Sequence, residues 1–227
     1  MAFLQKLILS KPWREINWRD KQRDLQYVRN YKPKTEGQLL RILLHGPAGA
    51  GKSSFINSVQ SVLLGRMYAL ALANNTFSGC FTKKFNPDSK LSKDNQFYNK
   101  GPTNNDKVHV LVCVINANTL SQLSENIVKK IREIRKEASE LGIPQVAILT
   151  KIDQVCPEIK DDLQNIYKIK CLKEKMEMFS AKVGIPMNCI FPVKNYHEEI
   201  DLDSDVDSLI LSALRNIINF GDDCINK

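Results

Sequence analysis

The chain has 227 residues, of which 43% are hydrophobic and 26% are charged, a balance typical of a globular protein with one substantial core. Its formal net charge is +8, but the basic residues are too dispersed to require a nucleic-acid or membrane partner. There is no apolar run of about eighteen residues, and the N-terminal stretch is interrupted by Lys6 and lacks a cleavage site. We therefore expect a cytoplasmic protein without a membrane span.

Residues 1–36 are expected to form an N-terminal helical arm that ends at the sequence YKPK. Its basic residues alternate with four aromatic side chains: Trp13, Trp18, Tyr27 and Tyr31. This interleaving favours an amphipathic arm that buries its aromatic side chains on the domain and disfavours a nucleic-acid surface. The domain itself is expected to span residues 37–227.

An apolar run from Leu39 to His45 leads into a glycine-rich turn and then an amphipathic segment, the order that a phosphate-binding loop (P-loop) requires. The turn has the pattern G-x-x-x-x-G-K-[ST]; the alternative is a chance glycine turn. Glycine torsions let successive backbone N–H groups surround a β-phosphate, while Lys52 reaches the β and γ oxygens. Ser53 is placed to bind Mg²⁺, and Ser54 is the less suitable ligand. The expected phosphate-binding residues are Gly46, Ala48, Gly49, Ala50, Gly51, Lys52, Ser53 and Ser54.

A polar, poorly periodic region follows, and we expect residues 66–106 to be a reduced, mobile switch region. A nucleotide switch uses a hydroxyl that meets Mg²⁺ and the γ-phosphate; Thr76 and Thr82 are candidates, and Thr82 is the preferred metal ligand. The element D-x-x-G, which completes the metal shell and senses the γ-phosphate, occurs nowhere in the sequence. For this chain, a prediction that a nucleotide binds therefore does not carry with it a prediction that the γ-phosphate is hydrolysed.

Apolar runs then alternate with helical periodicity to the end of the sequence. The expected strands are 107–118, 145–150 and 188–193, and the expected helices are 123–141, 159–179 and 206–220, the last capped by Ser204 and Asp205. This alternation predicts an α/β fold with a mostly parallel sheet, the three-layer sandwich of P-loop NTPases.

The loop after the 145–150 strand reads T-K-I-D, the form of the guanine-specifying [NT]-K-x-D element. The carboxylate of Asp153 can accept hydrogen bonds from N1–H and the exocyclic amine of guanine, whereas adenine offers an acceptor and a C–H there. Lys151 can lay its aliphatic stem over the base; a solvated Lys and Asp at a strand end is the alternative. The expected base-binding residues are Thr150, Lys151, Asp153, Val193, Lys194 and Asn195. The expected ligand is GTP or GDP with Mg²⁺.

The cysteines show no C-x-x-C pair and no metal-ligand spacing to a histidine, so scattered reduced thiols are expected. They are Cys80, Cys113, Cys156, Cys171, Cys189 and Cys224.

Six stretches together resemble the GTP-binding region of the interferon-induced protein 44 and 44-like family. They are KPWREINW, YKPK, LLRILLHGPAGAGKSSFINSVQSVLLG, LTKID, VGIPMNCIFPVKNY and DSLILSALRNII. The resemblance covers most of the chain outside residues 66–106, but not the TLDc domain of the longer family members. It implies a role in vertebrate innate immunity and antiviral defence.

The chain departs from the family where TKKF runs directly into NPDSK, at Phe85 and Asn86. Family members carry further sequence here, including an element like D-x-x-G; loss or omission of a segment and a naturally reduced form both stay open. We expect a guanine-nucleotide-binding protein that is weak or silent as a GTPase. The alternative is a pseudo-GTPase module that binds protein or acidic partners. A homodimer and the identity of a protein partner stay open.

Overall fold

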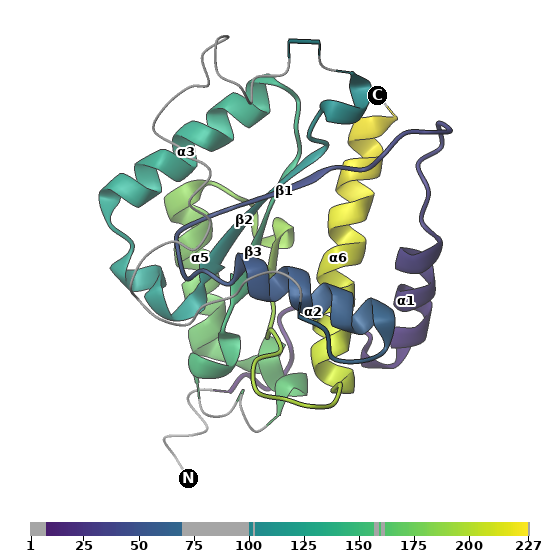
Figure 1. Cartoon of the computed structure of the whole chain (residues 1–227). Helices are drawn as coiled ribbons and strands as arrows, with labels where there is room; N and C mark the ends of the chain where they lie inside the picture. The colour runs from purple at the N-terminus through teal and green to yellow at the C-terminus, as the bar shows by residue number, and fades with distance from the viewer. Residues whose placement is uncertain (1–7, 70–99, 102, 157–158, 160–161, 227) are drawn as a thin grey trace.

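The computed structural model describes residues 8–69, 100–101, 103–156, 159 and 162–226. Four parallel strands form one sheet in the order β1-β2-β3-β4, and helices lie on both of its faces (Figure 1). The strands are β1 (Ile42–His45), β2 (Val110–Asn116), β3 (Gln145–Thr150) and β4 (Ile190–Pro192). The α/β fold with a parallel sheet is confirmed.

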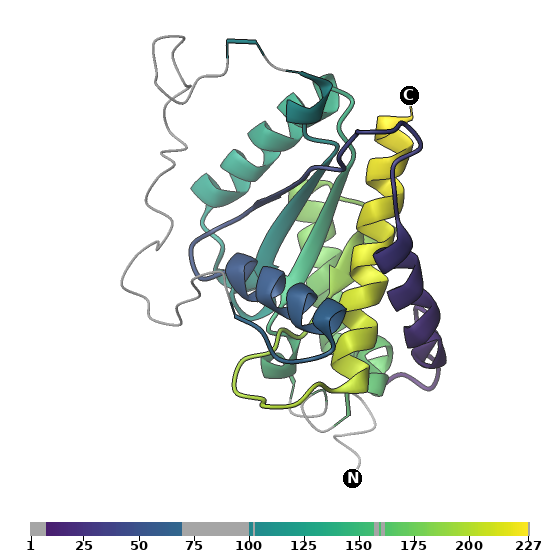
Figure 2. The ribbon, with the colours of Figure 1, turned by 45° about the vertical axis from the view of Figure 1, so that its right-hand side comes forward.

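Five α-helices of the described residues surround this sheet. They are α1 (Lys21–Asn30), α2 (Lys52–Leu64), α3 (Glu125–Glu140), α5 (Lys170–Val183) and α6 (Ser204–Ile225). Helices α2 and α6 cover one face of the sheet and α3 and α5 the other, while α1 lies on the outside of α6 (Figure 2).

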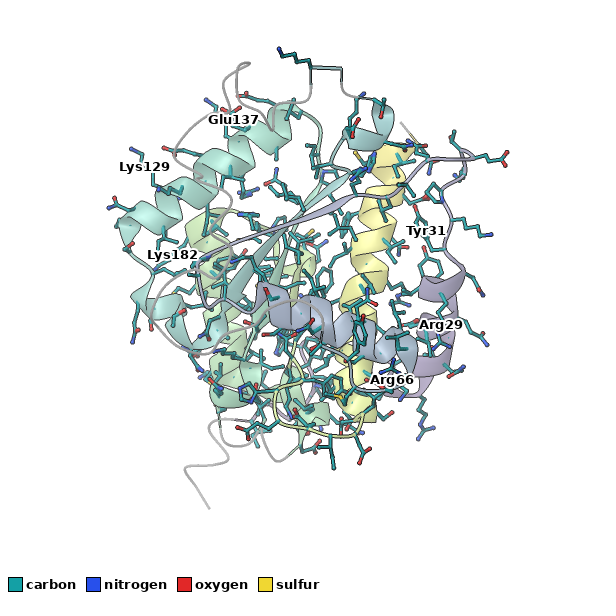
Figure 3. The ribbon with its side chains drawn as sticks, viewed as in Figure 1. Arg29, Tyr31, Arg66, Lys129, Glu137 and Lys182 are labelled. Carbon is teal, nitrogen blue, oxygen red and sulfur yellow. A yellow bond between two sulfur atoms is a disulfide. The ribbon has the colours of Figure 1, made fainter. Side chains whose placement is uncertain are left out.

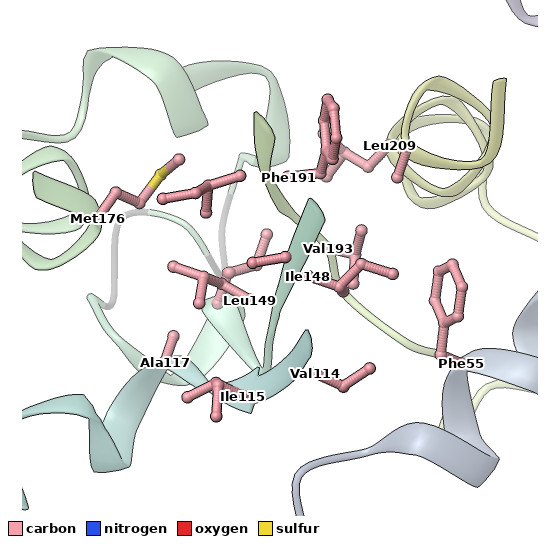
Figure 4. Close-up of a cluster of buried hydrophobic side chains, with 14 of the residues drawn as sticks. Phe55, Val114, Ile115, Ala117, Ile148, Leu149, Met176, Phe191, Val193 and Leu209 are labelled. Carbon is pink, nitrogen blue, oxygen red and sulfur yellow. The ribbon is translucent and has the colours of Figure 1, made fainter. Parts of the chain in front are cut away.

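The central strands are buried on both faces, which explains why their sequences are continuous apolar runs rather than alternating ones. Successive side chains of a strand point to opposite faces. Val114 and Ile148 accordingly project toward Phe55 of α2, whereas Leu149 projects toward Met176 of α5 (Figure 4). Strands β2 and β3 are therefore packed between two apolar layers, one on each face of the sheet, that separate them from the helices.

Strand β1 lies at one edge of the sheet and pairs with β2 from Ile42↔Val110 to His45↔Cys113. Its side chains are more exposed than those of β2, with Ile42 37% and Leu43 48% exposed. The strand that leads into the glycine-rich loop is thus anchored to the sheet along one side only.

The described part of the N-terminal arm packs against α6 through polar contacts as well as apolar ones. The Tyr27 hydroxyl donates to Asn219 at 2.6 Å, and the Tyr31 hydroxyl donates to Asp222 at 2.9 Å. Tyr31 lies beside α6 (Figure 3). Burial, followed by the hydrogen bond to Asp222, raises the pKa of Tyr31, so this hydroxyl remains a donor. The arm therefore docks on the domain, but the expected burial of its aromatic side chains is incomplete: Trp13, Trp18 and Tyr31 are half-buried and Tyr27 is 39% exposed.

Helical periodicity over 159–179 does not give one helix. The structure has a 3₁₀ helix, η6 (Leu163–Lys168), followed by α5, with Ile169 extended between them at φ −76° and ψ 112°. Ile169 forms an antiparallel bridge with Ile8, and the Leu9 N–H donates to the Lys168 carbonyl at 2.8 Å. Backbone pairing with the arm stabilises the extended conformation of Ile169 between the two helices. This tertiary contact cannot be recognised from local periodicity.

One further expectation needs correction. The N-cap of α6 is Asp203, whose carboxylate accepts from the backbone N–H groups of Asp205 and Val206, and not Ser204 or Asp205. Cys156 and Cys171, 15 residues apart in sequence, lie close together in the connection between β3 and α5, but their Cα atoms are 7.6 Å apart, beyond the about 4.4 to 6.8 Å that a disulfide spans. The expectation of reduced thiols therefore stays a prediction for this pair.

None of the helices in the described part of the chain has both the length and the apolar composition needed to cross a bilayer.

Candidate nucleotide-binding site

The glycine-rich loop joins the carboxyl end of β1 to the first turn of α2 and lies directly against β2. Gly46 has φ 142°, and a Cβ at this position would meet the Val114 carbonyl oxygen at 2.0 Å. Gly51 has φ 94° and is the N-cap residue of α2. A side chain at Gly46 would push the loop off the sheet, so the pattern's first glycine is required by close packing.

The ammonium group of Lys52 folds back over this loop. Its Nζ donates to the carbonyl oxygens of Gly46 at 2.9 Å and Pro47 at 2.8 Å. Nearby, burial and then the charge of Lys52 lower the pKa of His45 to about 4. The imidazole is therefore neutral at pH 7, and Lys52 supplies the positive charge at this end of β1.

The remaining expected phosphate-binding residues lie around the start of α2. Ala48 and Gly49 form the exposed tip of the loop, Ala50 is 2% exposed, and Ser53 and Ser54 are half-buried in the first helical turn. The Phe55 N–H donates to the Gly51 carbonyl at 2.8 Å and begins the helical ladder. The N–H groups of the first turn point beyond the helix end, where an anion is favoured.

The expected base loop and the glycine-rich loop meet in space. The Thr150 hydroxyl lies 2.6 Å from the Ala50 carbonyl oxygen and 3.3 Å from that of Ile115, and Thr150 is fully buried. Asn195 Nδ2 donates to the Gly51 carbonyl at 3.4 Å. Because the carboxyl ends of parallel strands share one edge of the sheet, the loops after β1, β3 and β4 converge here.

Lys151 and Asp153 lie in the turn that follows β3. Lys151 has φ 56° and caps the 3₁₀ helix η5 (Ile152–Gln154), which contains Asp153. Asp153 is partly exposed and makes no ion pair with another described residue. On the neighbouring loop, Asn118 Nδ2 donates to Gln154 Oε1 at 3.0 Å and ties this turn to the end of β2.

In the loop after β4, the first residue, Val193, is hydrogen-bonded to β3, and the second, Lys194, forms an ion pair outside the sheet. The Val193 N–H donates to the Leu149 carbonyl at 2.8 Å, and Lys194 pairs with Glu199 at 2.8 Å. Partial burial is the largest single effect and opposes ionisation of Glu199, but the hydrogen bonds from Lys194 and from backbone N–H groups, together with the Lys194 charge, outweigh it and lower the pKa of Glu199 to about 2. Asn195 Oδ1 is buried and has no hydrogen-bond partner among the described residues. An acceptor left in this state requires a donor from a ligand or a water.

Sequence reasoning missed the residues that support this loop from behind. The Tyr196 N–H donates to Ser58 Oγ of α2 at 3.0 Å, and the Tyr196 hydroxyl donates to Asp207 of α6 at 2.6 Å. Tyr196 directly follows the expected base-binding residues, which was a signal in the sequence. Ser58 and Asp207 gave none, because each is one polar residue on an otherwise ordinary helix.

The preferred metal ligand Thr82, the alternative Thr76, and the Phe85 to Asn86 junction lie outside the described residues. Within the described ranges, no group of three or more His, Cys, Asp or Glu side chains is arranged to hold a metal ion. Ser53, the other expected Mg²⁺ ligand, lies in the first turn of α2 beside Lys52.

A separate cavity of about 810 Å³ lies between arm residues 12–18 and η6. Arg14 lines it but donates to the carbonyl oxygens of Ile190 and Met187, and Asp162 accepts from the Gln164 N–H at 2.9 Å. These groups are engaged with the protein itself. The cavity lies where the arm docks, and none of the expected phosphate- or base-binding residues lines it.

The fold and these contacts define an α/β protein with an all-parallel sheet and a glycine-rich strand–loop–helix unit joined to the loops after β3 and β4. Human interferon-induced protein 44 is 30% identical over 249 residues, covering 88% of this chain and 56% of that protein. The mouse protein of the same name is 31% identical over 243 residues (86% and 58%), and human interferon-induced protein 44-like is 27% identical over 247 residues (86% and 55%). The chain is a homologue of interferon-induced protein 44 and 44-like, and the predicted resemblance is confirmed.

The chain spans little more than half the length of these relatives. No family model matches it, and no solved structure matches it. Since 88% of 227 residues is about 200, about 49 of the 249 positions aligned with the human protein have no counterpart here. The relatives therefore contain sequence within the matched region that this chain lacks.

Proposed function

We propose that this chain binds GDP and GTP, with Mg²⁺, at the loops after β1, β3 and β4. The observation that carries the proposal is the buried hydrogen bond from Thr150 to Ala50, which joins the base-specifying sequence to the glycine-rich loop. A nucleotide needs both parts at one fixed separation, because its base and its phosphates are held by different loops.

The residues present fit the ligand. Gly46 lets the loop lie close to β2, Lys52 brings an ammonium to the loop, and Asn195 Oδ1 is a buried acceptor without a described partner. On binding, Lys52 would exchange its carbonyl partners for phosphate oxygens, a stronger charge-assisted contact. Ser53 would hold Mg²⁺, which neutralises phosphate charge when bound.

Guanine is favoured over adenine by the donor and acceptor pattern that Asp153 can recognise. Its partly exposed carboxylate has no ion pair with a described residue that would compete for it. Lys151 lies in the same turn, where its stem can cover the base. Val193, Lys194 and Asn195 are proposed to meet the base edge from the neighbouring loop.

The biological setting follows from the relatives, whose names describe interferon-induced proteins. The chain is proposed to act in the interferon-induced antiviral response, in the cytoplasm, with weak or silent GTP turnover because the sequence contains no D-x-x-G element. The second candidate, a pseudo-GTPase interaction module, is favoured by that same absence.

Titration calorimetry with the full chain separates the two candidates. GDP and GTP should bind in the presence of Mg²⁺, removal of Mg²⁺ should weaken GTP more than GDP, and ATP at the same concentrations should give no saturable heat. If neither guanine nucleotide binds, nucleotide recognition is ruled out and the interaction module is retained. Equal binding of ATP and GTP would retain the phosphate site but remove guanine specificity.

A further inference from the structure

A partly buried ion pair connects the N-terminal arm to the first turn of α6. Lys21 Nζ of α1 lies 2.9 Å from Asp207 Oδ2, and the side chain of Asp207 is only 3% exposed whereas that of Lys21 is 32% exposed. A buried carboxylate requires a compensating charge and hydrogen bonds. The arm supplies the charge, although it is 186 residues distant in sequence.

The other oxygen of Asp207 fixes Tyr196. The Tyr196 hydroxyl donates to Asp207 Oδ1 at 2.6 Å and accepts from the Asp203 N–H at 2.8 Å. Burial, followed by the hydrogen bond to Asp207, raises the pKa of Tyr196, so its hydroxyl stays protonated and continues to donate. The Tyr196 hydroxyl is therefore fixed by one hydrogen bond that it donates and one that it accepts.

Tyr196 in turn ties the loop after β4 to the helix that follows the glycine-rich loop. Its backbone N–H donates to Ser58 Oγ at 3.0 Å, and Ser58 is 1% exposed in α2. The preceding residue, Asn195, contacts the Gly51 carbonyl at the N-cap of α2. A continuous chain of polar contacts thus runs from the arm to the candidate nucleotide site.

We propose that Lys21 is a positioning residue for the nucleotide site, acting through Asp207 and Tyr196 on the loop after β4. Its effect on nucleotide affinity rests on the proposed function, whereas its effect on the loop does not. Without Lys21, the buried Asp207 carboxylate loses the cation beside it and must move or draw in water to replace that contact. Either change weakens the acceptor that holds the Tyr196 hydroxyl, and the loop loses its fixed position.

The test uses variants of the full chain and two readouts. Lys21→Met removes the ammonium but keeps the aliphatic stem, Lys21→Arg keeps a charge, and Lys21→Met with Asp207→Asn removes both charges while keeping an acceptor for Tyr196. Arg23→Met is the control for loss of a positive charge on the same helix, because Arg23 is 62% exposed and pairs with Asp20 and Asp24 rather than with Asp207. The readouts are GDP affinity with Mg²⁺ by calorimetry and hydrogen exchange of the Tyr196 amide without nucleotide.

Lys21→Met should weaken GDP about tenfold and speed exchange of the Tyr196 amide by a similar factor, in the range of measured coupling between distant sites. Lys21→Arg and the double variant should return both GDP affinity and amide exchange most of the way to the wild-type values. Arg23→Met should change neither measurement by more than about twofold. If Lys21→Met lowers only the melting temperature, with both readouts unchanged, the positioning role is overturned. If the wild-type chain binds no GDP, the proposed function fails by itself, and the exchange measurement alone decides whether the arm holds the loop. If Lys21→Met does not fold, failure of the double variant to restore wild-type exchange overturns the proposal.

Discussion

The Thr150 hydroxyl lies 2.6 Å from the Ala50 carbonyl oxygen, although the two residues are 100 positions apart in the sequence. Replacing Thr150 with valine keeps the shape of the side chain but removes its hydroxyl. The Ala50 carbonyl then loses this hydrogen-bond donor. We expect the free energy of unfolding to fall by about 1 to 3 kcal/mol, measured by urea denaturation, and GDP to bind more weakly. Thr150→Ser, which keeps the hydroxyl, is the control. A valine variant as stable as the serine variant would show that the hydrogen bond does not hold the loops together.

Lys52→Ala should weaken both GDP and GTP by at least about tenfold, since it removes a charge-assisted contact of about 1.5 to 3 kcal/mol. Calorimetry on the folded variant is the measurement. Lys129→Ala is a matched control because the Lys129 side chain is 77% exposed on α3. Unchanged nucleotide affinity in a folded Lys52→Ala variant would contradict the phosphate-loop assignment.

Asp153→Asn should shift preference from guanine toward xanthine nucleotides. The C2 carbonyl of xanthine can accept from the new amide N–H, whereas the carboxylate contact with the guanine amine is lost. Competition of XDP and GDP for a fluorescent guanine nucleotide measures the shift. Asp162→Asn, on the other side of the same connection, should leave the preference unchanged. A variant that still prefers GDP as strongly as the wild type would place the base elsewhere.

Acid should destabilise the chain through His45. Burial and the Lys52 charge lower the pKa of His45 from 6.5 to about 4 in the folded state, so the unfolded chain binds more protons between these values. Stability contributed by the neutral imidazole is complete above pH 6.5 and is lost progressively as the pH falls toward 4. His45→Gln should therefore flatten the dependence of unfolding free energy on pH in this window, measured by urea denaturation. A His45→Gln variant that keeps the wild-type dependence of unfolding free energy on pH in this window would contradict this expectation.

GTP turnover should be very slow even when GTP binds. In-line attack needs an oriented water, a complete Mg²⁺ shell and stabilisation of γ-phosphate charge, and without D-x-x-G the sequence provides only part of these. We expect a rate at or below about 10⁻⁴ s⁻¹, the order known for a small GTPase without an arginine finger. A single-turnover assay at saturating protein and Mg²⁺ measures it. Complete hydrolysis within about a minute would mean that another residue replaces the missing element.

The sequence by itself determined the features that depend on neighbouring residues. Apolar runs bounded by turns predicted β2 and β3, because parallel strands covered on both faces need apolar residues at every position. The glycine spacing predicted a strand–loop–helix unit from β1 to α2, because local torsions set it. The expected nucleotide-binding residues were recognised for the same reason, and their binding role stays a prediction.

Only the tertiary structure decided which distant groups meet. The break at Ile169 depends on pairing with Ile8, and the neutralisation of Asp207 depends on Lys21, from the opposite end of the chain. Neither partner carries a local pattern, since a lysine on an amphipathic helix is usually solvated. A buried charge or an extended residue between two helical segments is stable only when a specific partner reaches it. Chain folding brings that partner into place, and periodicity records only which face of an element is apolar.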